Sequence, residues 1–404
     1  MTWKLPLILD GATGTQLQKR GFTGDQCAEA WTLAHPDVMI DLQRAYVESG
    51  SQIVYSPTFG ANRVKLESHG IFGKVEEFNA QLVALSRRAA GDRALVAGDI
   101  SPTGLFLYPL GETTFEELFE IYTEQAAALE KAGVDLFVVE TMVTLAEARA
   151  AVLAVKSVSR KPVFVSFSCD ENGKTLTGTD MTAAAAVMQG MGIAAFGMNC
   201  STGPKEMLPQ LKRLHGHAQV PILAKPNAGL PEVEHGQTVY RCTPVEFAAL
   251  AGDMAAAGVS IFGGCCGTGP EHISALAQAA RGFSAPPSAF QFGDLLPCST
   301  EKLPFYLDPD TPIGEVLSCT DALEDDLIEA CASSEVVAVA IDSKEELQLF
   351  ADCQHLATKP LCIVCDDAAL LEQALRQYQG RALYEGSLPD EVLMPLTQTY
   401  GLII

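Results

Sequence analysis

The sequence predicts an α/β protein, a (β/α)8 TIM barrel followed by a smaller C-terminal α/β module. Short apolar runs alternate with longer segments of helical period from residue 1 to about residue 284, as in repeated βα units on a parallel sheet. Eight such runs fit into roughly 280 residues, which is the usual size of this barrel. A doubly wound open sheet normally has about five to seven strands, so the barrel is favoured.

The expected barrel strands are short and mostly apolar. They cover residues 5–10, 53–56, 95–99, 136–140, 163–168, 194–199, 222–225 and 260–262. Capping-box spacing, with a glutamate three residues after a threonine, predicts helix starts at Thr114, Thr144 and Thr243. Apolar residues at helical spacing between 115 and 129 predict an amphipathic helix that can cover the sheet.

Charge and composition exclude some classes of partner. The chain has 27 Lys and Arg against 50 Asp and Glu, and its net charge of −23 repels nucleic acids and anionic membranes. Neither a signal peptide nor an apolar run of roughly 18 residues is recognisable. We therefore expect a globular cytoplasmic protein whose 12 cysteines stay reduced.

A change in composition marks the end of the barrel. We assign residues 1–284 to the barrel, the proline-rich residues 285–315 to a linker, and residues 316–404 to an acidic α/β module. From residue 285 onward there are 21 acidic and 5 basic residues, which account for −16 of the net charge. The expected strands of this region are 336–341, 361–364, 382–384 and 402–404, with helices from Lys344, Asp367 and Asp390. We interpret the module as a divergent remnant of a larger barrel that serves docking or stability.

Charged side chains stand where several expected strands end, which is where a barrel of this kind has its active site. Asp10, Asp99 and Glu140 end three strands, and Lys225 ends another. A buried carboxylate is costly unless a cation pairs with it, so Asp10 and Glu140 are candidates for binding a cationic group. The alternative is a hydrogen bond from a neighbouring loop amide. We expect Lys225 to form an ion pair at the rim and to have no catalytic role.

Three cysteines that are distant in sequence converge on the same rim. Cys200 follows the sixth strand, and Cys265 and Cys266 follow the eighth. Three thiolates would repel one another, whereas three sulfurs around Zn²⁺ leave one tetrahedral position open, as in catalytic zinc sites. We therefore predict a zinc site whose open position takes a substrate thiol. The alternative is that the three are small buried residues in a glycine-rich turn.

Two other features are expected to be structural. Cys362 and Cys365 have the spacing of a metal or redox pair, but they lie inside an apolar strand, so we predict that they belong to the core. His272 is expected at the exposed start of the last barrel helix.

The chain resembles the homocysteine S-methyltransferase family in five segments that occur in the same order. They are residues 9–15 (LDGATGT), 58–63 (TFGANR), 197–201 (GMNCS), 226–231 (PNAGLP) and 263–268 (GGCCGT). The resemblance spans residue 1 to about residue 282, about 70% of the chain. Residues 99–104 (DISPTG), 175–180 (TLTGTD) and the PNAG segment are most similar to the homocysteine domain of cobalamin-dependent methionine synthase.

The resemblance implies a barrel with zinc held by Cys200, Cys265 and Cys266, in agreement with the strand-end argument. It also implies that Asn227 completes the zinc shell before the substrate arrives. No catalytic residue is assigned beyond this zinc site.

The resemblance also implies how homocysteine is bound. Asp10 and Glu140 would receive its ammonium group, and the backbone around Gly11 and Ala12 would help to hold its carboxylate. Because a thiol that coordinates zinc is deprotonated, the expected reaction is attack of the homocysteine thiolate on an activated methyl group, which gives methionine.

The methyl donor is less well defined. Cobalamin-dependent methionine synthases continue into pterin-binding and corrinoid-binding modules, and this sequence contains no Asp-x-His-x-x-Gly corrinoid motif. We therefore expect methylcobalamin to be supplied by a separate corrinoid protein. The alternatives are S-methylmethionine or another small donor, a different thiol acceptor, or a non-catalytic module that binds zinc or a partner.

Overall fold

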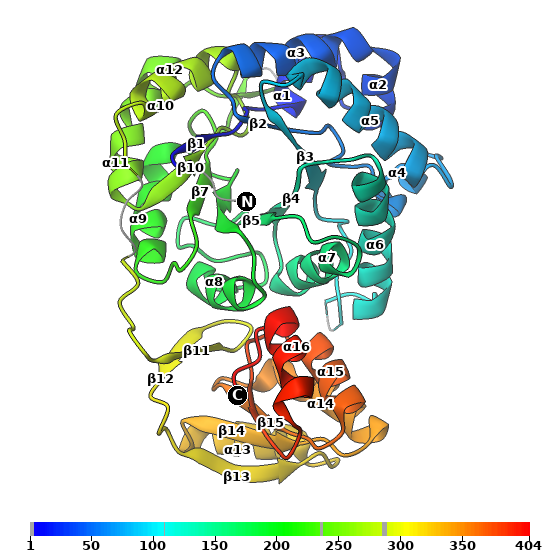
Figure 1. Ribbon diagram of the computed structural model, residues 1–404, viewed down its shortest axis with the longest axis vertical. Helices are drawn as coiled ribbons and strands as arrows, with labels where there is room; N and C mark the ends of the chain where they lie inside the picture. The colour runs from blue at the N-terminus through cyan, green and yellow to red at the C-terminus, as the bar shows by residue number, and fades with distance from the viewer. Residues whose placement is uncertain (1–3, 109, 235–236, 285–288) are drawn as a thin grey trace.

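The barrel predicted from the sequence is confirmed. The computed structural model describes residues 4–108, 110–234, 237–284 and 289–404. Eight parallel strands form one sheet in the order β1-β10-β7-β6-β5-β4-β3-β2, and a parallel bridge from Leu9 to Ile53 closes it (Figure 1). The strands are β1 (Leu7–Ile8), β2 (Ile53–Tyr55), β3 (Leu95–Ile100), β4 (Leu136–Met142), β5 (Val163–Phe167), β6 (Ala195–Asn199), β7 (Ile222–Lys225) and β10 (Val259–Phe262).

Helices surround this sheet on its outer side (Figure 1). They are α1 (Gly14–Gln18), α2 (Ala28–Ala34), α3 (Pro36–Glu48), α4 (Arg63–Ser68), α5 (Val75–Ala90), α6 (Phe115–Lys131), α7 (Leu145–Val158), α8 (Met181–Gly190), α9 (Pro204–His215), α10 (Pro244–Ala249), α11 (Ala251–Ala256) and α12 (Pro270–Ala280). A small antiparallel hairpin of β8 (Glu232–Glu234) and β9 (Gln237–Val239) lies in the loop after β7.

Side-chain alternation along the strands produces two separate apolar layers. One buried cluster contains side chains from all eight barrel strands, among them Leu9, Phe164 and Ile261, and fills the barrel. A larger cluster, which includes the intervening strand positions, packs the sheet against the helices. The rigid wall produced by these two layers fixes the positions of the strand ends.

The predicted helix starts are found where expected. Thr114 and Thr243 each form a complete capping box with the glutamate three residues later. Thr144 caps α7 by accepting a hydrogen bond from the backbone of Glu147. The Glu147 carboxylate does not complete a capping box, because it accepts hydrogen bonds from Thr103 and the hydroxyl of Tyr122 instead.

The C-terminal part is a four-stranded parallel sheet in the order β13-β14-β15-β16. Its strands and helices are β13 (Ile313–Ser318), α13 (Leu323–Ser333), β14 (Val336–Ala340), α14 (Lys344–Cys353), the 3₁₀ turn η1 (Gln354–Leu356), β15 (Leu361–Val364), α15 (Ala368–Gln377), β16 (Leu383–Glu385) and α16 (Asp390–Tyr400). Strands follow one another in space as they do in sequence, as in consecutive units of a barrel wall. Cys362 and Cys365 are buried, and each joins an apolar cluster, as predicted.

The stretch 285–315, expected as a linker, contains more structure than predicted. Its residues 285–288 lie outside the described residues, but β11 (Leu296–Ser299) and β12 (Pro304–Leu307) form an antiparallel hairpin. Strand β13 also begins inside this stretch, at an exposed edge where apolar and polar residues mix and the apolar signal is weak. The expected strand at 402–404 contributes only a single bridge, from Leu383 to Ile403.

Buried polar contacts join the C-terminal part to the barrel beneath α7 and α8 (Figure 1). The fully buried guanidinium of Arg149 on α7 donates hydrogen bonds to the carbonyls of Leu375 and Arg376 on α15. Arg376 in turn forms two hydrogen bonds with Glu116 on α6. The two parts therefore share one continuous interface.

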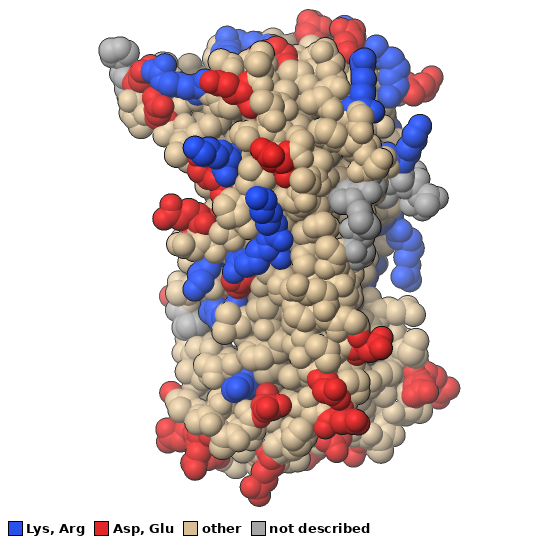
Figure 2. Space-filling view, turned by 90° about the vertical axis from the view of Figure 1, so that its left-hand side faces the viewer, with Lys and Arg blue, Asp and Glu red and all other residues tan. Residues whose placement is uncertain are grey.

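Acidic side chains gather over the C-terminal part, whereas the visible barrel surface carries both signs of charge (Figure 2). This matches the charge asymmetry of the sequence. No helix in the described ranges is both long enough and apolar enough to cross a membrane.

Candidate active site

A cavity of about 290 Å³ opens at the carboxyl ends of the barrel strands. Its lining includes residues from seven of the strand ends or the loops that follow them: Asp10, Tyr55, Asp99, Glu140, Cys200, Lys225, Cys265 and Cys266. Most of these side chains were predicted to lie at strand ends, and the structure brings them into one pocket.

The three cysteines form one sulfur cluster. Their Sγ atoms lie within 4.8 Å of one another, and those of Cys200 and Cys266 are 4.0 Å apart. Backbone hydrogen bonds fix this arrangement, since the amide of Cys200 donates to the carbonyl of Lys225 and the amide of Cys265 donates to that of Pro226. The segment that carries β7 thus ties the two cysteine loops together.

The local backbone at Cys200 is strained. Cys200 and the following Ser201 have φ values of 63° and 58°, in the left-handed region that non-glycine residues rarely occupy. Such strain persists where the surrounding structure enforces it, which is common at functional sites. Here it turns the Cys200 thiol back toward Cys265 and Cys266.

The pKa values of the three thiols are shifted in different directions. Hydrogen bonds from Cys265, and next from Cys266, lower the pKa of the Cys200 thiol to about 3. The same contact with Cys200 raises the pKa of Cys266 to about 11 and that of Cys265 well above its usual value. The contacts within the cluster therefore favour the thiolate form at Cys200 and the protonated form at Cys265 and Cys266.

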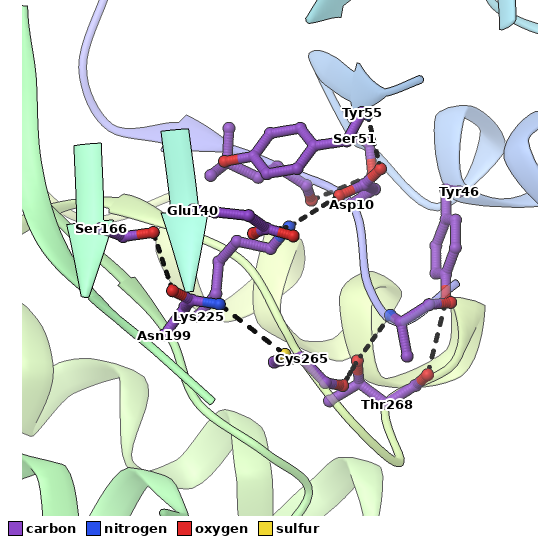
Figure 3. Close-up of polar contacts among 12 residues, drawn as sticks. Asp10, Tyr46, Ser51, Tyr55, Glu140, Ser166, Asn199, Lys225, Cys265 and Thr268 are labelled. Carbon is purple, nitrogen blue, oxygen red and sulfur yellow. Dashed lines mark hydrogen bonds and ion pairs between the residues drawn. The ribbon is translucent and has the colours of Figure 1, made fainter. Parts of the chain in front are cut away.

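Two asparagines contact the sulfur cluster. The amide nitrogen of Asn199 lies 4.0 Å from the Cys265 sulfur, and its oxygen accepts hydrogen bonds from Ser166 and from the backbone of Thr141 (Figure 3). A hydrogen bond from Asn227 contributes to the lowered pKa of Cys200. The Oδ1 atom of Asn227 is buried without a hydrogen-bond partner.

Lys225 joins Asp10 and Glu140 inside the barrel. Its Nζ atom lies 3.1 Å from Oδ1 of Asp10, 3.6 Å from Oε2 of Glu140 and 3.5 Å from the centre of the Tyr55 ring (Figure 3). The expected ion pair is present, but its position at the rim was wrong, because Lys225 is only 3% exposed. Its side chain lies inside the barrel mouth and lines the floor of the cavity.

Burial and charge act in opposite directions on the pKa values of Asp10, Glu140 and Lys225. Burial raises the pKa values of Asp10 and Glu140, while the charge of Lys225 opposes the rise. Burial alone would lower the pKa of Lys225, but the charges of Glu140 and Asp10 raise it well above its usual value. The two carboxylates therefore favour the charged form of Lys225.

Asp99 is a third buried carboxylate of the pocket, to which the sequence analysis gave no role. It is 5% exposed, and its Oδ1 atom has no hydrogen-bond partner. Burial, and next the charge of Glu140, raises the pKa of Asp99 well above its usual value. Its place at the end of a strand, and at the start of the segment 99–104, were the signals in the sequence that pointed to it.

Close packing shapes the segment with Gly11 and Ala12. A Cβ atom on Gly11 would lie 2.8 Å from Tyr46 and 2.9 Å from Thr268, so only glycine fits there. The amide of Ala12 already donates a hydrogen bond to Oγ1 of Thr268, and the hydroxyl of Tyr46 donates to the carbonyl of Ala12. Tyr46 and Thr268 lie side by side in Figure 3. Thr268 also donates to the carbonyl of Cys265, which links this segment to the sulfur cluster.

The predicted exposure of His272 was wrong. Its ring is 6% exposed, with Nδ1 accepting from the amide of Gly269 and Nε2 within 2.9 Å of the carbonyl of Cys242. The imidazole satisfies backbone groups at the start of α12, so its role is structural.

Comparisons with known proteins agree with this geometry. Residues 7–280 match the family model described as homocysteine S-methyltransferase. The chain is 36% identical to a methionine synthase of Mycobacterium leprae over 68% of this chain and 24% of that protein. It is 33% identical to a methionine synthase of Mycobacterium tuberculosis over 75% of this chain and 27% of that protein. The chain therefore spans about a quarter of the length of these curated relatives.

A solved structure shows the same fold. The homocysteine methyltransferase MmuM from Escherichia coli, in its oxidized form, has a TM-score of 0.59 at 24% identity, over 67% of this chain and 95% of that chain. Since the family model covers more than half of the sequence, the chain belongs to the homocysteine S-methyltransferase family.

Proposed function

We propose that this protein transfers a methyl group to the thiol of homocysteine and so produces methionine, with a zinc ion held by Cys200, Cys265 and Cys266. The sulfur cluster at the carboxyl end of the barrel carries this proposal. Family membership supports the reaction, and the charged pocket beside the cluster supports an amino-acid substrate.

The residues present fit zinc. Three thiols within 4.8 Å of one another are the donor set of a catalytic zinc site that keeps one position for a substrate. When bound, zinc would supply Lewis acidity that keeps a coordinated substrate thiol deprotonated at neutral pH. The orphaned Oδ1 of Asn227 supports the expectation that this residue serves the metal before the substrate arrives.

The chain's own residues would orient the substrate. The acidic end of the pocket, where Asp10 and Glu140 lie, would receive the ammonium group of homocysteine. The glycine-containing segment at Gly11 and Ala12 would lie along its carboxylate. Burial of these groups excludes water from the amino-acid end, which strengthens each charge interaction.

We propose a methyl-corrinoid as the donor, because the matched relatives are methionine synthases. A separate corrinoid protein is the proposed source of this donor, and free methylcobalamin stands in for it in the donor panel. Within this proposal residues 1–284 form the catalytic barrel and residues 316–404 an accessory module. The contacts of Arg149 with the C-terminal part support a stabilising role for that module.

A panel of donors tests the function. The purified full-length chain is given homocysteine with methylcobalamin, S-methylmethionine or betaine, methionine is measured by mass spectrometry, and zinc is measured in the same sample. We expect about one zinc per chain and methionine from methylcobalamin. Methionine from S-methylmethionine alone would contradict the donor, and absence of both zinc and methyl transfer would contradict the function.

A further inference from the structure

We infer that Asn199 is a positioning residue that sets the span between the two ends of the pocket, because it holds a strained bulge at Thr141. The inference rests on the proposed function, in which one end of the pocket binds the amino-acid groups of the substrate and the sulfur cluster binds its thiol. It goes beyond that proposal by naming the residue that determines which length of amino thiol fits.

Strand β4 contains a bulge at its carboxyl end. Its pairing with β5 shifts between Val139 and Met142, so that Glu140 and Thr141 lie opposite the single residue Ser166. Side chains alternate between the two faces of a strand, so in a regular strand Thr141 would face away from the cavity that Glu140 lines. With the extra residue, Glu140 and Thr141 both line the cavity. The bulge therefore determines how the end of β4 faces the pocket.

The bulge depends on an unfavourable backbone conformation. Thr141 has a φ of 60°, and a β-branched residue is a genuine outlier in this left-handed region. Such a conformation persists only where the surrounding structure enforces it, which is common at functional sites. A partner that binds both the backbone and the side chain of Thr141 would enforce it.

Asn199, at the end of β6, is that partner. Its Oδ1 atom accepts a hydrogen bond from the amide of Thr141 at 2.9 Å, and its Nδ2 atom donates one to Oγ1 of Thr141 at 2.7 Å. Oδ1 also accepts a hydrogen bond at 2.8 Å from the hydroxyl of Ser166, the residue opposite the bulge. Asn199 is 1% exposed, so it acts on a ligand through its neighbours.

The same amide group reaches the sulfur cluster. Its Nδ2 atom lies 4.0 Å from Sγ of Cys265, and Cys200 is the next residue along the chain (Figure 3). An amide group has two donor hydrogens and two acceptor lone pairs, so the contacts with Thr141, Ser166 and Cys265 use its full capacity. One buried side chain thus connects the residue after Glu140 to the cysteines, and it fixes the separation between them.

A fixed span selects substrates by their length. An α-amino thiol has to reach from the carboxylate end of the pocket to the sulfur cluster, and a chain that is one methylene shorter cannot satisfy both ends equally well. Homocysteine and cysteine differ by one methylene, so this pair measures the span. If the bulge relaxes, the end of β4 can move, and cysteine should lose its disadvantage.

The test measures the ratio of the dissociation constants of cysteine and homocysteine by calorimetric titration of the zinc-loaded protein. We expect the wild-type protein to prefer homocysteine by roughly 10- to 200-fold. In Asn199→Ala this preference should fall by about tenfold. The ratio does not depend on how much of a sample is folded and loaded, because both constants refer to the same binding-competent fraction.

Asn79→Ala is the matched control. Asn79 is also fully buried, its Nδ2 atom donates to the carbonyls of Ala61 and Val75, and none of the three lines the cavity. This variant should unfold at a lower urea concentration but keep the wild-type preference. The double variant Asn199→Ala/Thr141→Gly should recover most of the preference, because glycine adopts a φ of 60° without strain.

A wild-type preference in Asn199→Ala would overturn the inference, and so would a double variant that discriminates no better than Asn199→Ala. Asn199→Ser, whose single hydroxyl cannot replace both contacts with Thr141, repeats the comparison where the alanine variant does not fold. A wild-type protein that binds neither thiol is a separate result, which would overturn the proposed function.

Discussion

The Nζ atom of Lys225 lies 3.1 Å from Oδ1 of Asp10, and both side chains are almost completely buried in the barrel. A buried ion pair is costly to break from one side, because the remaining charge is left without a partner. Lys225→Met should therefore lower the free energy of unfolding by about 3–5 kcal/mol, measured by urea denaturation at neutral pH.

The double variant Lys225→Met/Asp10→Asn provides the control. Removing the negative partner as well should recover part of the lost stability, since one unpaired charge disappears. If the stability losses of the two single variants simply add in the double variant, the 3.1 Å contact does not couple Lys225 and Asp10 energetically.

The sulfur cluster gives a second prediction. Cys265→Ala should reduce bound zinc from about one ion per chain to well below half, because two thiols no longer supply the catalytic donor set. Metal content is measured by mass spectrometry after dialysis against a weak chelator. Cys242→Ala is the matched control, since Cys242 lies near this region but outside the cluster. Equal zinc in both variants would contradict the proposed ligand set.

Strong local patterns predicted most of the barrel. Apolar runs with charged residues at their ends located all eight strands to within a few residues, and the capping boxes at Thr114 and Thr243 were confirmed. Strand β13 was not predicted, because an exposed edge strand lacks the continuous apolar run that marks a buried one. The hairpin of β11 and β12 was hidden by prolines, which favour a loop interpretation.

The sequence placed the charged residues and the three cysteines at the strand ends, but it did not predict how the charged side chains pair. Sequence position places Asp10, Asp99, Glu140 and Lys225 at strand ends, yet it does not say which carboxylate takes up the lysine. The pairing of Lys225 depends on where the side chains point in the closed barrel. In the folded protein, Oδ1 of Asp99 has no hydrogen-bond partner. The burial of His272 was missed for the same reason, because its partners are backbone groups brought to it by folding.

The raised pKa of Asp99 predicts how the stability of the protein depends on pH. Burial, with the charge of Glu140, raises this pKa well above 3.8, although Lys225 and Lys65 oppose the rise and Asp10 adds to it. The folded protein thus binds this proton more tightly than the unfolded chain, so ionisation of Asp99 removes stability as pH rises from about 4 toward the folded-state pKa. Asp99→Asn should therefore stabilise the protein at pH 8.

The sign of this effect can be checked in one pair of measurements. The gain in the free energy of unfolding of Asp99→Asn over the wild-type protein should be largest at pH 8 and should shrink at about pH 4.5, where the wild-type carboxyl is protonated in the folded state. Urea denaturation at the two pH values measures it. A gain that grows as pH falls would mean that the pKa of Asp99 is lowered rather than raised.

Thr268 connects the substrate segment to the sulfur cluster. Its hydroxyl accepts a hydrogen bond from the amide of Ala12 at 3.1 Å and donates one to the carbonyl of Cys265 at 2.7 Å. Thr268→Val keeps the shape but leaves both buried groups unpaired, so it should lower the free energy of unfolding by about 1–3 kcal/mol and weaken zinc binding in chelator competition. Thr268→Ser keeps the hydroxyl and should behave like the wild-type protein. A loss in Thr268→Ser as large as that in Thr268→Val would show that the hydrogen bonds of the hydroxyl do not account for the effect.

Arg149 gives a prediction for the interface between the barrel and the C-terminal part. Its buried guanidinium donates to the carbonyls of Leu375 and Arg376, at the end of α15. Arg149→Met fills similar space but leaves these carbonyls without their donor, so unfolding should become easier by about 1–3 kcal/mol and proteases should cleave the C-terminal part sooner. Arg88→Met, at an exposed position on α5, should change neither measurement. Arg149 does not line the cavity that holds the sulfur cluster, so the zinc content of Arg149→Met should stay at the wild-type level. A loss of zinc in this variant would show that the C-terminal part also supports the metal site.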